Sequence, residues 1–158
     1  SEIIHSVPTT VGKCFDLEAK KENAIIHHNY LSIDQYLNRL NIYTTKQAEF
    51  IISERVYFSW NFLITKPVGE FLSRYFSGQG YKDGLHGLVL SVLQAFSEFI
   101  VYLKVWQFLK FEDQNINLGD VVKQMKQVES DIHYWQADVL LQEGGGIVQK
   151  IKRKFKLR

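Results

Sequence analysis

The last twelve residues combine cationic and apolar side chains at a spacing suited to one task. Residues 147–158 hold six basic side chains and no acidic one, whereas the remaining residues hold 13 basic and 17 acidic groups. The formal net charge of +2 is therefore the sum of a cationic tail and a net negative remainder. The apolar residues Ile147, Val148, Ile151 and Phe155 recur at helical spacing, which predicts an amphipathic basic helix.

Basic amphipathic helices lie on anionic membrane surfaces, where each cation contributes on the order of 1 kcal/mol. We therefore predict that the tail binds a membrane, with a solvated terminal segment as the alternative. No nucleic-acid partner is expected, because an arm that contacts phosphates does not need apolar residues along one side. The predicted membrane-binding residues are Ile147, Lys150, Ile151, Lys152, Arg153, Lys154, Phe155, Lys156 and Arg158.

A second group of chemically capable side chains is His27-His28-Asn29-Tyr30. Neighbouring residues of a strand point to opposite faces, so one of the two histidines would face a given site. A single His at a strand end is usually a hydrogen-bonded structural residue, and a metal or phosphate contact is the alternative. The sequence has no phosphate-binding Gly-rich loop, no Gly-x-Ser-x-Gly elbow and no His-Glu-x-x-His pair. Its single Cys excludes a multi-Cys zinc site, and no catalytic residue is predicted.

The elements that must position these groups are mostly helical by pattern, which predicts a mainly α fold. The 158 residues, 46% of them hydrophobic, can bury one core. We expect a short N-terminal loop and strand segment, with the strand at residues 23–28, then several amphipathic and apolar helices and the basic tail. Ser32, followed three positions later by Gln35, is a capping box that starts the first helix.

Helix start and stop signals divide the middle of the chain. Thr44 or Thr45 is expected to cap a second helix. The aromatic-rich residues 57–64 are predicted to be helical. Pro67 suits the first turn of a further helix, which we expect to end before Gly78.

Two long helices follow in the pattern. Asp83 is expected to cap an apolar helix over about residues 83–110, and Glu98 and Lys104 favour a buried or interfacial position over a membrane span. Residues 117–142 carry apolar side chains at heptad spacing, which fits either self-association or packing on the protein's own core. A triple glycine then forms a flexible joint. The predicted division of the chain is 1–31, 32–110, 111–143 and 144–158.

Two stretches, in the same order and at similar spacing, resemble the C-terminal part of bacterial family 2 glycosyltransferases. The first is residues 25–48, IIHHNYLSIDQYLNRLNIYTTKQA. The second is residues 67–106, with PVGEFLSRYF, then GYKDGLHG, then an apolar run ending in YLKVW. The resemblance covers roughly residues 3–110. It implies that the chain is either the downstream portion of a longer enzyme, which we favour, or a separate accessory module, and that this segment alone does not transfer sugar.

In such an enzyme, an N-terminal GT-A-type domain binds the nucleotide-sugar donor together with a divalent metal, Mg or Mn, which that domain mostly holds. The resemblance implies that His27 is a candidate contact to the metal or the diphosphate. It implies sugar transfer to a lipid-linked or cell-surface polysaccharide acceptor, by a protein bound peripherally at the cytoplasmic face of the bacterial inner membrane. The residues alone leave a rival: a non-enzymatic helical module that binds a membrane and self-associates through residues 117–142.

Overall fold

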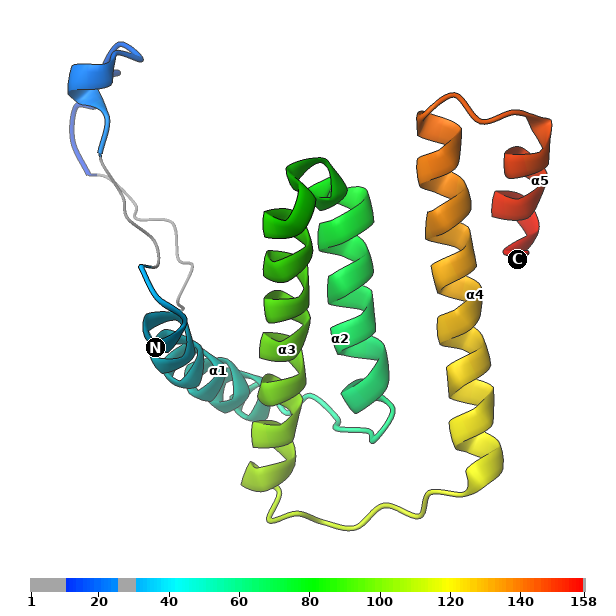
Figure 1. Ribbon diagram of the computed structural model, residues 1–158. Helices are drawn as coiled ribbons and strands as arrows, with labels where there is room; N and C mark the ends of the chain where they lie inside the picture. The colour runs from blue at the N-terminus through cyan, green and yellow to red at the C-terminus, as the bar shows by residue number, and fades with distance from the viewer. Residues whose placement is uncertain (1–10, 26–30, 158) are drawn as a thin grey trace.

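The computed structural model describes residues 11–25 and 31–157, and within these ranges the chain is mainly α, as predicted (Figure 1). No strand occurs in the described ranges, where Lys21–Asn23 form a short 3-10 turn and Ala24 and Ile25 are irregular. The rest of the predicted strand, with His27 and His28, lies outside the described residues. The helices are α1 (Ile33–Ser53), α2 (Phe62–Leu72), α3 (Gly84–Phe108), α4 (Leu118–Gln142) and α5 (Ile147–Phe155).

The first helix begins at the predicted capping box but runs much further than predicted. The Ser32 hydroxyl accepts a hydrogen bond from the Gln35 backbone N–H at 3.2 Å, and the Gln35 side chain accepts one from the backbone N–H of Leu31. The predicted break at Thr44 or Thr45 is wrong. Their hydroxyls donate to backbone carbonyls one turn earlier, at 2.7 and 2.8 Å. Both threonines therefore make their hydrogen bonds inside one continuous helix, and neither caps a new one.

The second helix also departs from the prediction. Of the aromatic-rich residues 57–64, only those from Phe62 onward are helical. Pro67 lies inside α2 rather than in its first turn, so α2 lacks one internal N–H donor there. The helix passes into a π-helical turn, Ser73–Ser77, and ends at Gly78 as expected.

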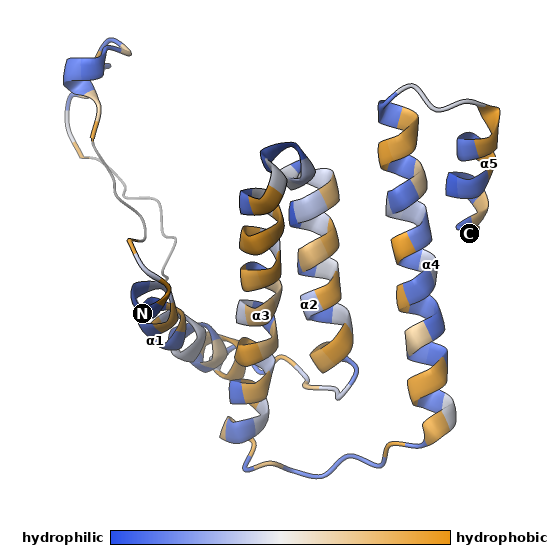
Figure 2. Ribbon diagram, viewed as in Figure 1, coloured by the Kyte–Doolittle hydropathy of each residue, from blue (hydrophilic) through white to orange (hydrophobic). Residues whose placement is uncertain are grey.

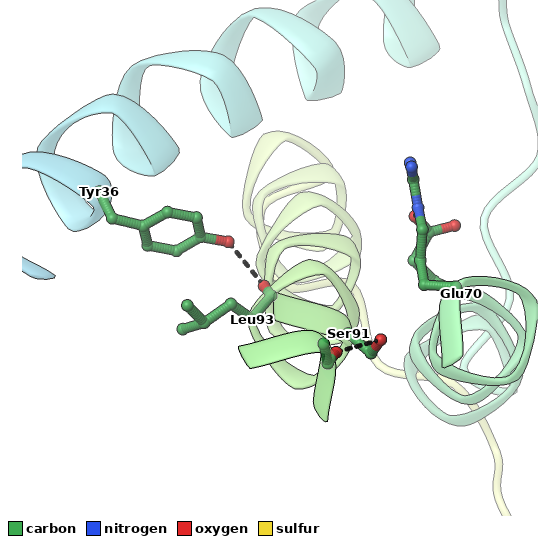
Figure 3. Close-up of polar contacts among 6 residues, drawn as sticks. Tyr36, Glu70, Ser91 and Leu93 are labelled. Carbon is green, nitrogen blue, oxygen red and sulfur yellow. Dashed lines mark hydrogen bonds and ion pairs between the residues drawn. The ribbon is translucent and has the colours of Figure 1, made fainter. Parts of the chain in front are cut away.

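The hydrophobic core lies where α1 and the loop before α2 meet the C-terminal half of α3. Ala48, Phe58, Val101 and Val105 are almost fully buried there, and Tyr102 completes the cluster. Polar contacts fix α1 along α3 in addition, as Figure 3 shows for the hydroxyl that Tyr36 donates to the Leu93 carbonyl, at 2.8 Å. The core is therefore small and sits at one end of the long helix.

Lys104 is a second polar link between α1 and α3. Its ammonium donates to the backbone carbonyl and the side-chain oxygen of Asn41 and to the Thr45 hydroxyl, at 2.7, 2.8 and 2.7 Å. Burial lowers the pKa of this ammonium. One of the two charged residues predicted to oppose a membrane span thus faces α1 instead of the outside.

The turn between α2 and α3 depends on two glycines. A side chain at Gly87, on the first turns of α3, would place its Cβ 1.9 Å from the backbone carbonyl oxygen of Gly80. The backbone of the turn therefore touches α3 directly. Asp83 precedes α3 as predicted, but its side chain makes no capping hydrogen bond.

The last two helices form a separate hairpin beside α2 (Figure 1). The bounds of α4 match the heptad-patterned segment, and the Asn117 side chain caps it by accepting from the Asp120 N–H at 2.9 Å. At the other end of α4, the Tyr81 hydroxyl reaches Glu143 at 3.4 Å. The turn before α3 therefore contacts the C-terminal end of α4.

Candidate membrane interface

The predicted basic helix is present as α5, and a glycine turn folds it back along α4. Gly144 has φ +96°, a backbone conformation that L side chains rarely adopt, and Gly145 and Gly146 complete the reversal. The first turns of α5 therefore lie beside the last turns of α4, and the two helices run antiparallel (Figure 1). The triple glycine is a turn of defined shape in the structure.

The polar face of α5 is the face that packs on α4. Arg153 Nε lies 2.8 Å from Asp138 Oδ1, and Lys156 Nζ lies 2.6 Å from Asp131 Oδ1. The Arg153 guanidinium also donates to the Tyr134 hydroxyl at 3.2 Å, and its carbon lies 5.4 Å from the centre of that ring. The hydrogen bond to Tyr134, reinforced by the Asp138 charge, raises the pKa of Arg153. Two of the predicted membrane-binding cations are therefore already paired within the protein.

The apolar face of α5 is left uncovered. Ile147 is 73% exposed, Val148 58%, Ile151 49% and Phe155 61%. Figure 2 shows hydrophobic colour on the side of α5 turned away from α4. A surface helix of a globular protein normally buries its apolar stripe and exposes its polar face. Here the arrangement is reversed, since the polar face packs on α4 and the apolar stripe is exposed.

The cations beside this stripe are the ones that α4 does not pair. Lys150 and Lys154 are exposed, and the Lys154 ammonium lies 5.5 Å from the centre of the Phe155 ring. Lys152 is half-buried, and Arg158 lies outside the described residues. The outer side of α5 therefore combines uncovered apolar side chains with free positive charge, as an interfacial helix does.

A second uncovered apolar surface lies on the first half of α3. Leu85 is 76% exposed, Val89 41%, Val92 50% and Phe96 43%, and their spacing of three and four places them on one stripe. By length and composition the segment Gly80–Phe108 suffices to cross a membrane, a test that core helices of soluble proteins also pass. Only 22% of its most apolar window is buried in this protein.

The second charged residue of α3, Glu98, is partly withdrawn from solvent. Glu98 is half-buried, and burial, reinforced by the nearby Glu70 carboxylate, raises its pKa, while a hydrogen bond to Gln47 opposes the rise. Glu70 itself pairs with Arg74, whose Nε lies 2.7 Å from Glu70 Oε1. The outer stripe of α3 is consequently free of charge along its exposed length.

The predicted metal contact is not brought to this surface. His27 lies outside the described residues, and in the part of the chain that the structure describes no three His, Cys, Asp or Glu side chains gather where they could hold a metal ion. Sequence reasoning also missed the docking of α5. Asp131, Tyr134 and Asp138 share one face of α4 by helical spacing, but no local pattern pairs that face with the basic residues of α5.

Part of the chain is similar in sequence to known proteins. No known family profile matches the chain, and no solved structure matches it. Two uncharacterized glycosyltransferases, from Rickettsia typhi and Rickettsia prowazekii, are each 29% identical to it over 94 residues, which is 60% of this chain. The chain spans about a third of the length of these relatives, since the match covers 32% of each. The chain is thus similar in sequence to part of a glycosyltransferase.

Proposed function

We propose that this chain is the C-terminal portion of a membrane-associated glycosyltransferase of the family 2 type. The complete enzyme moves a sugar from a nucleotide-sugar donor to a lipid-linked or cell-surface polysaccharide acceptor. The similarity to two glycosyltransferases supports the reaction class. The outward apolar face of α5, flanked by free cations, is the observation that carries the membrane role.

In this proposal the chain attaches the enzyme to the membrane that holds its acceptor. The apolar stripe of α5 enters the boundary between headgroups and acyl chains, and full burial of each such side chain contributes about 1.5–3 kcal/mol. Each unpaired cation adds on the order of 1 kcal/mol on an anionic surface. Binding is peripheral, at the cytoplasmic face of the bacterial inner membrane, where anionic headgroups complement the tail.

The donor and most of the chemistry belong to an upstream domain in this proposal. That domain holds the nucleotide sugar and a divalent metal, Mg or Mn, and His27 contributes a contact to the metal or the diphosphate. Such a contact stabilises charge on the departing diphosphate. In the complete enzyme, His27→Ala should then lower activity by roughly 100-fold, whereas His28→Ala should matter less. Equal and small losses in both variants would remove His27 from the site.

Sedimentation with lipid vesicles tests the membrane role. The 158-residue protein should sediment with vesicles of phosphatidylcholine and phosphatidylglycerol and much less with phosphatidylcholine alone. Deleting residues 147–158 should remove most of that preference, and added salt should weaken it as the Debye length falls toward about 8 Å. Equal binding of the intact and truncated proteins at low salt would refute the proposal.

A matched pair of variants separates insertion from simple charge attraction. Replacing Ile151 and Phe155 with Ser keeps every cation but removes the exposed apolar groups, so vesicle binding should weaken. Replacing Gln149, which is half-buried toward α4, with Ser is the control and should leave binding unchanged. If the Ser variants at Ile151 and Phe155 bind like the control, the apolar stripe does not insert.

A non-enzymatic module that self-associates through α4 is the second candidate, and one observation favours it. Leu118 and Met125 of the heptad stripe are 78% and 52% exposed, so the first half of the stripe lacks cover from the protein's own core. Replacing Val128 and Ile132 with Asp should leave a folded monomer by light scattering if the stripe joins two copies. The same variant should unfold if the stripe packs within one chain.

A further inference from the structure

A cleft lies at the end of the bundle remote from the α2–α3 turn. The loop between α1 and α2 and the connection between α3 and α4 form its two walls, and both lie at the same end of the helices (Figure 1). Its volume is about 640 Å³, within the range of small-molecule sites. None of its lining residues belongs to the apolar stripe of α5 or to that of α3.

One side chain ties the two walls together. The Gln114 amide oxygen accepts from the backbone N–H of Trp60 at 2.7 Å, and its amide nitrogen donates to the carbonyl of Phe58 at 3.1 Å. The Trp106 indole also donates to the Glu112 carbonyl at 2.8 Å. The two Gln114 bonds hold together loops that lie 54 and 56 residues apart in sequence, whereas the Trp106 bond fixes the start of the α3–α4 connection. The cleft is therefore preformed, which lowers the ordering cost of binding a ligand.

The lining divides into an apolar floor and a mixed rim. Ile52, Phe58 and Leu109 form the floor, which is the outer side of the hydrophobic core. Tyr57 and Trp60 add aromatic rings, and Tyr57 is 75% exposed. Flat aromatic faces beside hydrogen-bonding groups suit a ligand that has both an apolar face and polar edges.

The rim supplies hydrogen-bond donors and acceptors of several kinds. Asn115 offers both an amide donor and an acceptor, Glu112 and Asp113 offer carboxylate acceptors, and Arg55 offers a donor fork. Arg55 follows the C-terminal cap of α1 and has φ +54°, where glycine is the usual and less strained residue. An arginine there costs stability and places a guanidinium beside the cleft.

We propose that this cleft binds a saccharide, and that it is a subsite for the sugar chain of the acceptor; the second part rests on the proposed function. Vicinal hydroxyls of a sugar ring present paired donors and acceptors to carboxylate, amide and guanidinium groups, and the ring's C–H face packs on an aromatic side chain. The two carboxylates at Glu112 and Asp113 outnumber the Arg55 charge, so the cleft disfavours phosphate and does not take the nucleotide.

Saturation-transfer NMR on the 158-residue protein tests the proposal without a membrane. The probes are methyl glucoside, methyl galactoside, methyl N-acetylglucosaminide and maltose, with uridine diphosphate as the anionic counter-probe. At least one sugar should bind, and uridine diphosphate should not displace it. Binding of no sugar, or displacement by uridine diphosphate, would overturn the proposal.

Variants locate the binding. Tyr57→Ala should weaken sugar affinity by about fivefold, the size expected for loss of one aromatic contact. Asn115→Ala should weaken it independently, which guards against a loop that misfolds without Tyr57. The control is Tyr43→Ala, which removes a 44% exposed tyrosine from the outside of α1. Equal binding by the Tyr57 and Tyr43 variants would overturn the assignment to this cleft.

The sugar-binding test and the vesicle-binding test can fail separately. Sugar binding that depends on Tyr57 stands even if the protein ignores anionic vesicles, in which case the membrane role fails alone. Vesicle binding that depends on α5, with no sugar bound, rejects the cleft and leaves the membrane role intact. In the complete enzyme, Tyr57→Ala should raise the acceptor KM and leave the donor KM unchanged.

Discussion

Replacing Gly87 with Ala tests how the α2–α3 hairpin is closed. The added Cβ would lie 1.9 Å from the carbonyl oxygen of Gly80 and 2.8 Å from its carbonyl carbon. Ordinary contact begins near 3.4 Å, so one of the two backbones must move by about 1.5 Å. The obstacle is main chain, which a rotamer change cannot relieve. We expect a loss of about 3 kcal/mol in the free energy of unfolding.

Gly69→Ala is the matched control, because it makes the same change inside a helix where nothing lies within 4 Å of the new Cβ. It should raise stability by about 0.5–1 kcal/mol through helix propensity. Urea titrations followed by far-UV circular dichroism give both values, and equal slopes show that the unfolded states match. A Gly87→Ala protein within about 0.5 kcal/mol of the wild type would refute the close approach of the turn to α3.

Three further predictions concern single polar contacts. Tyr36→Phe removes the hydrogen bond to the Leu93 carbonyl and should cost about 1 kcal/mol by urea titration. Glu98→Gln should raise the melting temperature near pH 7 and leave it unchanged below about pH 4. Burial and the Glu70 charge raise the pKa of Glu98 in the folded protein above its value in the unfolded chain. The wild type therefore loses stability as the pH rises from the unfolded pKa through the folded pKa. An increase in melting temperature that is the same at both pH values would contradict this explanation. Asp138→Asn should loosen α5, seen as faster trypsin cleavage in the tail with little change in global stability; unchanged cleavage would show that the ion pair does not hold the helix.

The helix starts that sequence reasoning located were those encoded by a few adjacent residues. Ser32 with Gln35 is such a case, and the structure confirms that cap. The prediction of a helix break at Thr44 was wrong because a threonine can also lie inside a helix. There its hydroxyl donates to the backbone carbonyl one turn earlier, as Thr44 does to Leu40. The prediction that Pro67 lies in the first turn of a helix was wrong because the packing of α2 on α3 outweighs the one hydrogen bond that proline removes from the helix interior.

What the sequence could not locate are features made by residues far apart in the chain. The cleft between the α1–α2 loop and the α3–α4 connection exists because Gln114 bonds to the backbone of Trp60. No local sequence pattern indicates that these two residues lie together. The amphipathic character of α5 was predictable, but its orientation was not. Periodicity shows that a helix has an apolar face, and only the partners Asp131 and Asp138 determine that this face points outward.

The docking of α5 on α4 also bears on the entropy cost of the proposed membrane attachment. A nine-residue helix such as Ile147–Phe155 is a coil in water by itself, because nucleation outweighs so few hydrogen bonds. A free peptide of residues 147–158 would therefore fold as it meets lipid, and ordering its backbone would consume about 1 kcal/mol or more per residue. In the whole protein that entropy is already lost during folding, so if the proposed membrane attachment holds, the helix would meet lipid already folded, and attachment and release would require no refolding of the tail.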